Sequence, residues 1–170
     1  GHPDPGSDVL GLAFGSLRSY AVTDCNLAQL MPAHWSHSEA STMPTVWTTV
    51  CAAVEQLSTV QQGGSVLVQA ATGGVGLVAV ICGQRSGVCV YATAGRTSKR
   101  LYLQSLEVHG MSTTRDHIAF GEEMAYSLRQ QAVGIVLNSL SHGDYIPAAA
   151  ALLDTGGTFV EIGKRGIWSR

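Results

Sequence analysis

The sequence is short of charged residues: Asp, Glu, Lys and Arg make up only 13% of its 170 residues, against about a quarter in soluble proteins. Ten basic residues stand against 12 acidic ones, so the basic excess of a nucleic-acid-binding protein is missing. A hydrophobic content of 45% excludes a disordered chain. We therefore expect a compact globular protein whose surface is partly covered by a partner domain or subunit.

Long apolar runs are absent as well. None approaches the roughly 20 residues needed to span a bilayer, and the opening GHPDPGSD is polar and proline-rich, unlike a signal peptide. These features predict a cytoplasmic protein with no membrane partner. The cysteines have no CxxC pairing and the histidines have no metal-ligand spacing, so we expect no metal site. Buried thiols are expected at Cys25, Cys51, Cys82 and Cys89.

From residue 65 onward, short β-branched runs alternate with apolar stretches of helical length. Strands are expected at 66–71, 88–95, 109–113, 134–140 and 157–163, and helices at 77–87, 97–106, 120–131 and 144–153. Ser98 is placed to cap the second of these helices. The alternation predicts the α/β class, with a Rossmann-like, doubly wound parallel sheet.

The N-terminal part follows another pattern. A helix is expected at 45–60, and strands at 15–24 and 27–32. Two or three strands cannot form an independent core. We therefore expect residues 1–33 to be the C-terminal remnant of a second domain, and residues 34–170 to be a Rossmann domain truncated at its end.

A glycine-rich turn, ATGGVG at 71–76, separates the first expected strand from its helix. It matches the A-x-G-x-x-G form of the dinucleotide fingerprint, in which one glycine lets the backbone approach a pyrophosphate and another allows close helix–strand packing. The strand before it and the helix after it are the context that the motif requires; a glycine turn without a ligand is the alternative. The candidate cofactor-binding residues of this loop are Thr72, Gly73, Gly74, Val75 and Gly76.

The segment after the second strand indicates which cofactor binds. NAD sites place an acidic residue there to hold the ribose 2′-hydroxyl, but residues 71–106 contain none. Instead the segment 95–100 reads GRTSKR, which suits a 2′-phosphate. A solvated basic helix start is the alternative, although cations at a helix N-terminus oppose the macrodipole. We therefore expect NADPH, bound through Gly95, Arg96, Ser98, Lys99 and Arg100.

Polar residues also follow the last two strands, and the carboxyl ends of parallel strands share one crevice. Asn138 and Ser139 end the fourth strand, and Gly163 ends the fifth, so all three are candidate cofactor-binding residues. Lys164 comes next and could protonate a carbanion or orient an acyl group; an ordinary surface lysine is the alternative.

The stretches PTVWTTV, VLVQAATGGVGL, VYATAG, VLNSL and FVEIGKRGI, in this order, resemble the enoyl-reductase domain of polyketide synthases, a member of the medium-chain dehydrogenase/reductase superfamily. The resemblance implies a zinc-free, NADPH-dependent reduction of an α,β-unsaturated thioester. An acyl carrier protein would hold that thioester, and neighbouring synthase domains would be partners. Residues 1–33 would then end a GroES-like substrate-binding domain. By position, Lys99 matches the 2′-phosphate lysine, Asn138 lies beside the nicotinamide ribose, and Lys164 matches the proposed proton donor.

Two departures from the family pattern suggest reduced stability: Glu107 stands where relatives usually have glycine, and Gly134 replaces an aspartate. Two other functions stay open at this point. One is a free-standing quinone or alkenal reductase, and the other is a non-catalytic structural module that keeps the fold.

Overall fold

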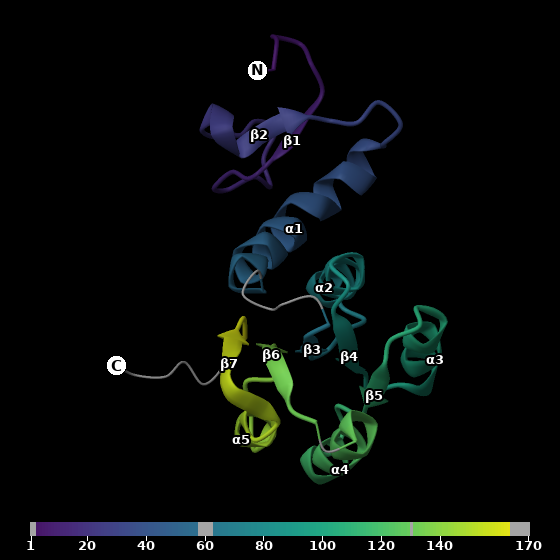
Figure 1. Ribbon diagram of the computed structural model, residues 1–170. Coiled ribbons are helices and arrows are strands. Elements are labelled where there is room, and N and C mark those ends of the chain that lie inside the picture. Colours follow the sequence, from purple (N-terminus) through teal and green to yellow (C-terminus); the bar gives the residue numbers. More distant parts are fainter. Residues whose placement is uncertain (1–2, 58–62, 130, 164–170) are drawn as a thin grey trace. The chain divides into compact units, whose positions relative to one another are not determined.

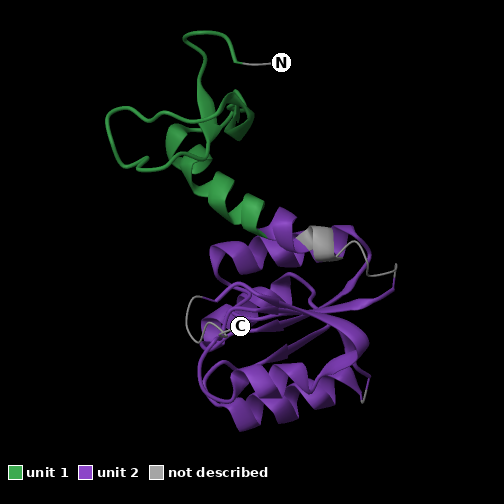
Figure 2. Ribbon diagram, turned by 90° about the vertical axis from the view of Figure 1, so that its left-hand side faces the viewer, with its two compact units in different colours: residues 1–49 green, residues 50–170 purple. Residues whose placement is uncertain are grey.

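The computed structural model describes residues 3–57, 63–129 and 131–163 (Figure 1). The chain divides into two compact units, Gly1–Thr49 and Val50–Arg170, which are coloured separately in Figure 2. The expected division between residues 33 and 34 concerns the domains of a longer fold and stays a prediction. No helix within the described ranges is long and apolar enough to cross a membrane.

The first unit contains a small antiparallel sheet of β1 (Val9–Gly11) and β2 (Ala28–Leu30), with a 3₁₀ turn, η1 (Cys25–Leu27), directly before β2. The strand predicted at 15–24 is wrong. Leu17 and Tyr20 are 102% and 76% exposed, and the segment pairs with no strand among the described residues. A short run with apolar residues does not by itself make a strand, because a strand also needs a neighbour to bond.

Helix α1 (His37–Leu57) begins earlier than residue 45, with His37 as its first residue and Pro44 inside it. A capping box explains the start. The Ser36 amide donates to Glu39 Oε2 at 2.9 Å, and the Glu39 amide donates to Ser36 Oγ at 3.2 Å. The Ser36 amide also holds the pKa of the Glu39 carboxyl below its ordinary value.

The second unit is built on a five-stranded, all-parallel sheet in the order β5-β4-β3-β6-β7. The strands are β3 (Ser65–Val68), β4 (Cys89–Thr93), β5 (Gly110–Ser112), β6 (Val133–Asn138) and β7 (Leu153–Glu161). The helices are α2 (Gly74–Arg85), α3 (Thr97–Ser105), α4 (His117–Leu128) and α5 (Tyr145–Ala150). Helices lie on both faces, with α2 on one and α4 and α5 on the other (Figures 1 and 2). This architecture confirms the predicted Rossmann-like, doubly wound α/β fold.

One large cluster of the core lies between the sheet and helices α4 and α5. Phe120, Met124 and Leu128 project from one stripe of α4 and are at most 2% exposed. They pack in one cluster with Leu67 of β3 and Val136 of β6. Each such side chain contributes about 1.5–3 kcal/mol through removal from water. Continuous apolar runs in the central strands are therefore explained by burial on both faces.

Local capping explains why α4, like α1, begins before its expected start. Helix α4 starts at His117 because Asp116 Oδ1 accepts the Ala119 amide at 2.8 Å. The prediction of Ser98 as the cap of α3 is wrong: the helix begins at Thr97, with Arg96 at the N-cap position, so Ser98 already lies in the first turn.

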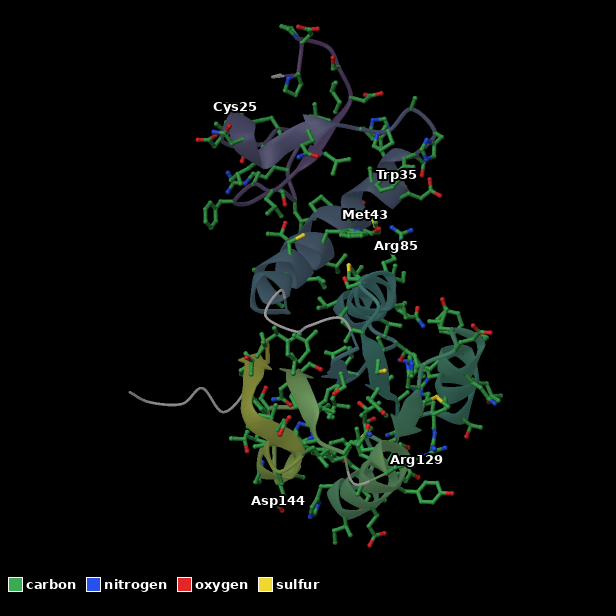
Figure 3. All side chains as sticks on the ribbon, in the orientation of Figure 1. Cys25, Trp35, Met43, Arg85, Arg129 and Asp144 are labelled. Atoms are coloured by element: carbon green, nitrogen blue, oxygen red, sulfur yellow. The ribbon has the colours of Figure 1, made fainter. Side chains whose placement is uncertain are left out.

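The cysteines are less buried than expected. All four thiols are free, but Cys25 (labelled in Figure 3) and Cys51 are exposed, while Cys82 and Cys89 are half-buried. The prediction of buried thiols is therefore wrong for the first two. Partial burial raises the pKa of the Cys82 thiol.

Glu107 follows the C-cap residue of α3, Leu106, and has a φ of 55°. This left-handed conformation is common after a helix and favours glycine, because a Cβ atom there crowds the backbone. A glycine at position 107 would adopt this conformation without that crowding.

We expect Glu107→Gly to raise the free energy of unfolding by about 1 kcal/mol, since it relieves this crowding. Urea unfolding followed by far-UV circular dichroism measures the change. Glu122→Gly is the matched control, because Glu122 is exposed within α4, and it should cost about 1 kcal/mol. Destabilisation by both substitutions would contradict the interpretation.

Candidate functional site

The candidate site lies at the carboxyl ends of the parallel strands. Strand β3 lies in the middle of the sheet, with β4 and then β5 on one side and β6 and then β7 on the other. The chain therefore leaves β3 in one direction and later returns to its other side. A ligand crevice forms outside the strand ends at such a reversal.

The turn after β3 is tied to its neighbour by Thr93, the last residue of β4. The Ala70 amide donates to Thr93 Oγ1 at 2.9 Å, and the Ala71 amide donates to the Thr93 carbonyl at 3.0 Å. Ala70 has a φ of 49°, in the left-handed region. Thr93 is fully buried. Its two hydrogen bonds therefore hold the turn in this strained conformation.

The glycine loop fits a pyrophosphate. Helix α2 begins at Gly74, inside the predicted motif, and has no acidic residue in its first turn. Gly73 and Gly74 are exposed, so their backbone is open to a ligand. A Cβ atom on Gly76 would lie 2.6 Å from Ala71 Cα and 2.7 Å from Ala70 O, so no side chain is possible there. The first amides of a helix have no acceptor within it and can bind an anion.

The other two loop residues lie in the same turn. Thr72 precedes Gly73, the N-cap residue of α2, and Val75 lies in the first turn of the helix; both side chains are half-buried. The structure thus brings all five predicted loop residues together at the carboxyl end of β3. Their contacts with a cofactor stay predictions.

The basic segment lies at the end of β4, beside the glycine loop. Arg96, Ser98 and Lys99 are exposed. Arg100 forms an ion pair, because its Nη2 lies 3.5 Å from Glu123 Oε2 of α4, and its contact with a cofactor stays a prediction. The same carboxylate oxygen accepts the Thr113 amide at 2.8 Å.

A further cation, Arg115, joins this region and was missed by the sequence analysis. Arg115 Nε donates to the Gly95 carbonyl at 3.1 Å. A Cβ atom on Gly95 would lie 2.6 Å from Thr114 Oγ1, so the segment after β5 packs directly on this glycine. The strand-end rule could have found Arg115, because it follows β5, the neighbour of β4.

On the other side of β3, the predicted residues Asn138, Ser139 and Gly163 come together with Glu161. Asn138 Nδ2 donates to Glu161 Oε2 at 2.5 Å, and the Gly163 amide donates to Glu161 Oε1 at 2.5 Å. Ser139 Oγ donates to the Gln69 carbonyl at 3.1 Å. Glu161 and Gln69 were not among the predicted site residues, although a glutamine ending an apolar strand run is a visible signal.

Acid–base and metal chemistry have few other candidates here. Tyr91 and Tyr145 belong to the hydrophobic core, and burial raises the pKa of both phenols, so they stay protonated at neutral pH. In the part of the chain that the structure describes, no three His, Cys, Asp or Glu side chains are placed to hold a metal ion. The predicted catalytic residue, Lys164, lies outside the described residues.

Known proteins show similarity over most of the chain, although no sequence-family model matches it. It is 38% identical over 166 residues to the erythronolide synthase EryA2 of Saccharopolyspora erythraea. That match covers 94% of this chain and 4% of the synthase. The chain is also 40% identical to the CurK enoyl reductase in its crystal structure, with a TM-score of 0.79 over 86% of this chain and 43% of that one.

A third match has nearly the extent of the Rossmann unit. It is the X-ray structure of the nucleotide-binding subdomain of the PpsC enoylreductase domain from Mycobacterium tuberculosis, with 32% identity and a TM-score of 0.67. The match covers 73% of this chain and 68% of that one. The present chain thus spans a small part of the synthases and less than half of the CurK reductase. Together with the parallel sheet and its glycine loop, these similarities show that the chain belongs to the enoyl-reductase domains of polyketide synthases, within the medium-chain dehydrogenase/reductase superfamily.

Proposed function

We propose that the chain is the NADPH-binding part of an enoyl reductase that works in the cytoplasm during polyketide chain extension. Its substrate would be an enoyl thioester on an acyl carrier protein, and its partners would include the neighbouring synthase domains. Residues 1–33 would be the end of a GroES-like substrate-binding domain. The observation that carries the proposal is the exposed basic segment at the end of β4, beside an open glycine loop.

The charges at the end of β4 favour NADPH over NADH. An NAD site needs a carboxylate there for the ribose 2′-hydroxyl, and residues 71–106 have none. Arg100 is paired with Glu123, whereas Arg96 and Lys99 are exposed and form no ion pair among the described residues. These two cations therefore remain available to a 2′-phosphate, which binds them through charge-assisted hydrogen bonds.

The reaction would proceed by hydride transfer to the β-carbon and proton transfer to the α-carbon. NADPH supplies the hydride when it is bound. The chain's own residues would bind the pyrophosphate at 72–76, hold the 2′-phosphate at 95–100, and support the nicotinamide ribose through Asn138. Lys164 would give the proton to the α-carbon.

The alternatives differ in what they require. A free-standing quinone or alkenal reductase would act on a small molecule, whereas a synthase domain would require the carrier-bound thioester. The similarity to synthases favours the latter. A non-catalytic module would keep the fold, and failure of the folded chain to bind NADPH in a fluorescence titration would favour that function.

We expect Lys99→Glu to weaken NADPH binding by about 10- to 150-fold, since a hydrogen bond to a charged group contributes about 1.5–3 kcal/mol. NADH lacks the 2′-phosphate, so its affinity should change by less than about threefold. Fluorescence titration with both cofactors measures the ratio.

Arg85→Glu is the matched control for this prediction. It makes the same charge change at the C-terminal end of α2, where Figure 3 labels Arg85, while the glycine loop is at the N-terminal end. This variant should keep the wild-type ratio of NADPH to NADH affinity. Equal losses for both cofactors in Lys99→Glu would refute the 2′-phosphate assignment.

We also expect Lys164→Ala, in the complete two-domain reductase, to lower turnover by about 100- to 10,000-fold, the usual effect of removing a general acid. Cofactor affinity should stay the same. Steady-state rates with a carrier-bound enoyl thioester measure turnover, and NADPH titration measures cofactor affinity. Arg165→Ala removes a charge from the adjacent position as a control, and undiminished turnover in Lys164→Ala would show that the proton comes from another group.

A further inference from the structure

Three strand ends are connected by side-chain hydrogen bonds on the side of β3 opposite the basic segment. Gln69 follows β3, and its Oε1 accepts the Leu140 amide at 3.2 Å from the segment after β6. The Gln69 carbonyl accepts Ser139 Oγ from the same segment. Asn138, the last residue of β6, in turn donates to Glu161, the last residue of β7.

The Glu161 carboxylate is the centre of these contacts, because it accepts from three different donors. Oε2 accepts from Asn138 Nδ2 at 2.5 Å, while Oε1 accepts from Ser141 Oγ at 3.0 Å and from the Gly163 amide at 2.5 Å. Only an acid side chain offers two acceptor oxygens and no donor. These contacts involve β6, the segment after β6 and the residues that follow β7.

Gly163 can lie this close to the carboxylate only because it has no side chain. A Cβ atom there would lie 1.5 Å from Ser141 Oγ and 2.6 Å from Glu161 Oε1. Any side chain at position 163 would therefore displace the serine and the carboxylate. The glycine is required by the contact and not only by the turn.

Two buried amide atoms extend this network. Gln69 and Asn138 are 2% and 0% exposed, yet Gln69 Nε2 and Asn138 Oδ1 find no hydrogen-bond partner within the described residues. Val68 pairs with Leu137, so the next residues, Gln69 and Asn138, follow in register on neighbouring strands. One atom is a donor and the other an acceptor. A water molecule that accepts from the first and donates to the second would join Gln69 to Glu161 through Asn138.

The position of this network in the sheet indicates which half of the cofactor would bind near it. The cations for the 2′-phosphate follow β4, and β6 and β7 lie on the other side of β3. A dinucleotide bound across the reversal point has its adenosine half over β4 and its nicotinamide half over β6 and β7. The Glu161 network would therefore lie near the nicotinamide half of a dinucleotide bound in this way.

We propose that Glu161 is a positioning residue, which holds Asn138, Ser141 and the Gly163 backbone in the arrangement that the nicotinamide half of NADPH requires. This inference rests on the proposed NADPH-binding function. It assigns no contact between Glu161 and the reacting atoms. Its role is to give two neighbouring strand ends one fixed geometry.

The test is Glu161→Gln in the full chain, with two probes. A glutamine has one acceptor oxygen, and its NH₂ group would face one of the present donors, so at least one donor loses its partner. We expect NADPH affinity to fall by about tenfold. The affinity of 2′,5′-ADP, which carries the 2′-phosphate but no nicotinamide, should stay the same.

A compensating substitution separates positioning from a general structural effect. In Glu161→Gln combined with Asn138→Asp, the new carboxylate can accept the glutamine NH₂ group, and the glutamine oxygen can still accept from Ser141 and Gly163. This double variant should bind NADPH more tightly than Glu161→Gln alone. Absence of any recovery would count against the pairing.

Gly163→Ala tests the same arrangement without changing a charge, and it should also weaken NADPH while sparing 2′,5′-ADP. Gly121→Ala is its control, because a Cβ atom there meets nothing within 4 Å. If wild type binds NADPH but Glu161→Gln binds both probes as wild type does, or loses both equally, the positioning role is overturned and the proposed function stands. If wild type itself fails to bind NADPH, both proposals fall.

Discussion

The hydrogen bonds that hold the end of β3 are the constraint on which the rest of the site depends. The Ala70 and Ala71 amides donate to Thr93 of β4, while the Gln69 amide donates to the Leu137 carbonyl of β6. The chain is thus bonded on both sides just where it turns into α2. This bonding keeps Ala70 in a left-handed conformation that an alanine otherwise avoids. If the turn relaxed, the glycine loop and the start of α2 would move with it.

Several of the few charged side chains of this chain make specific contacts in the fold. Glu123 of α4 contacts both the Arg100 side chain and the Thr113 amide. One acidic residue thus connects the first turn of α3 to the residue that follows β5. Arg115 adds a contact to the Gly95 carbonyl. Few charges are present, but several of them shape the segment that follows β4.

The sequence predicted the alternating strands and helices well, but it did not predict the hydrogen bonds between their ends. Periodicity located the alternating strands and helices, because burial on both faces leaves a continuous apolar run such as 66–68. The strand expected at 15–24 did not form, because no strand among the described residues lies alongside that segment. The hydrogen bonds of Thr93 and Glu161 join residues far apart in the sequence, and no local pattern encodes their distances. Asp116 and the Ser36–Glu39 pair did carry local capping signals, which periodicity alone ignores.

The two sides of β3 differ in a way that suits different tasks in the proposed function. Arg96 and Lys99 are exposed, so water and salt screen their charges, and they can adapt to a phosphate with little strain. Gln69 and Asn138 are buried, where hydrogen bonds are stronger and a mispaired group is costly. Exposed charges therefore favour recognition of the adenosine end, whereas the buried amides, held by a carboxylate, favour a single orientation at the nicotinamide end. A hydride transfer needs the second property more than the first, because its rate depends on the geometry of the reacting atoms.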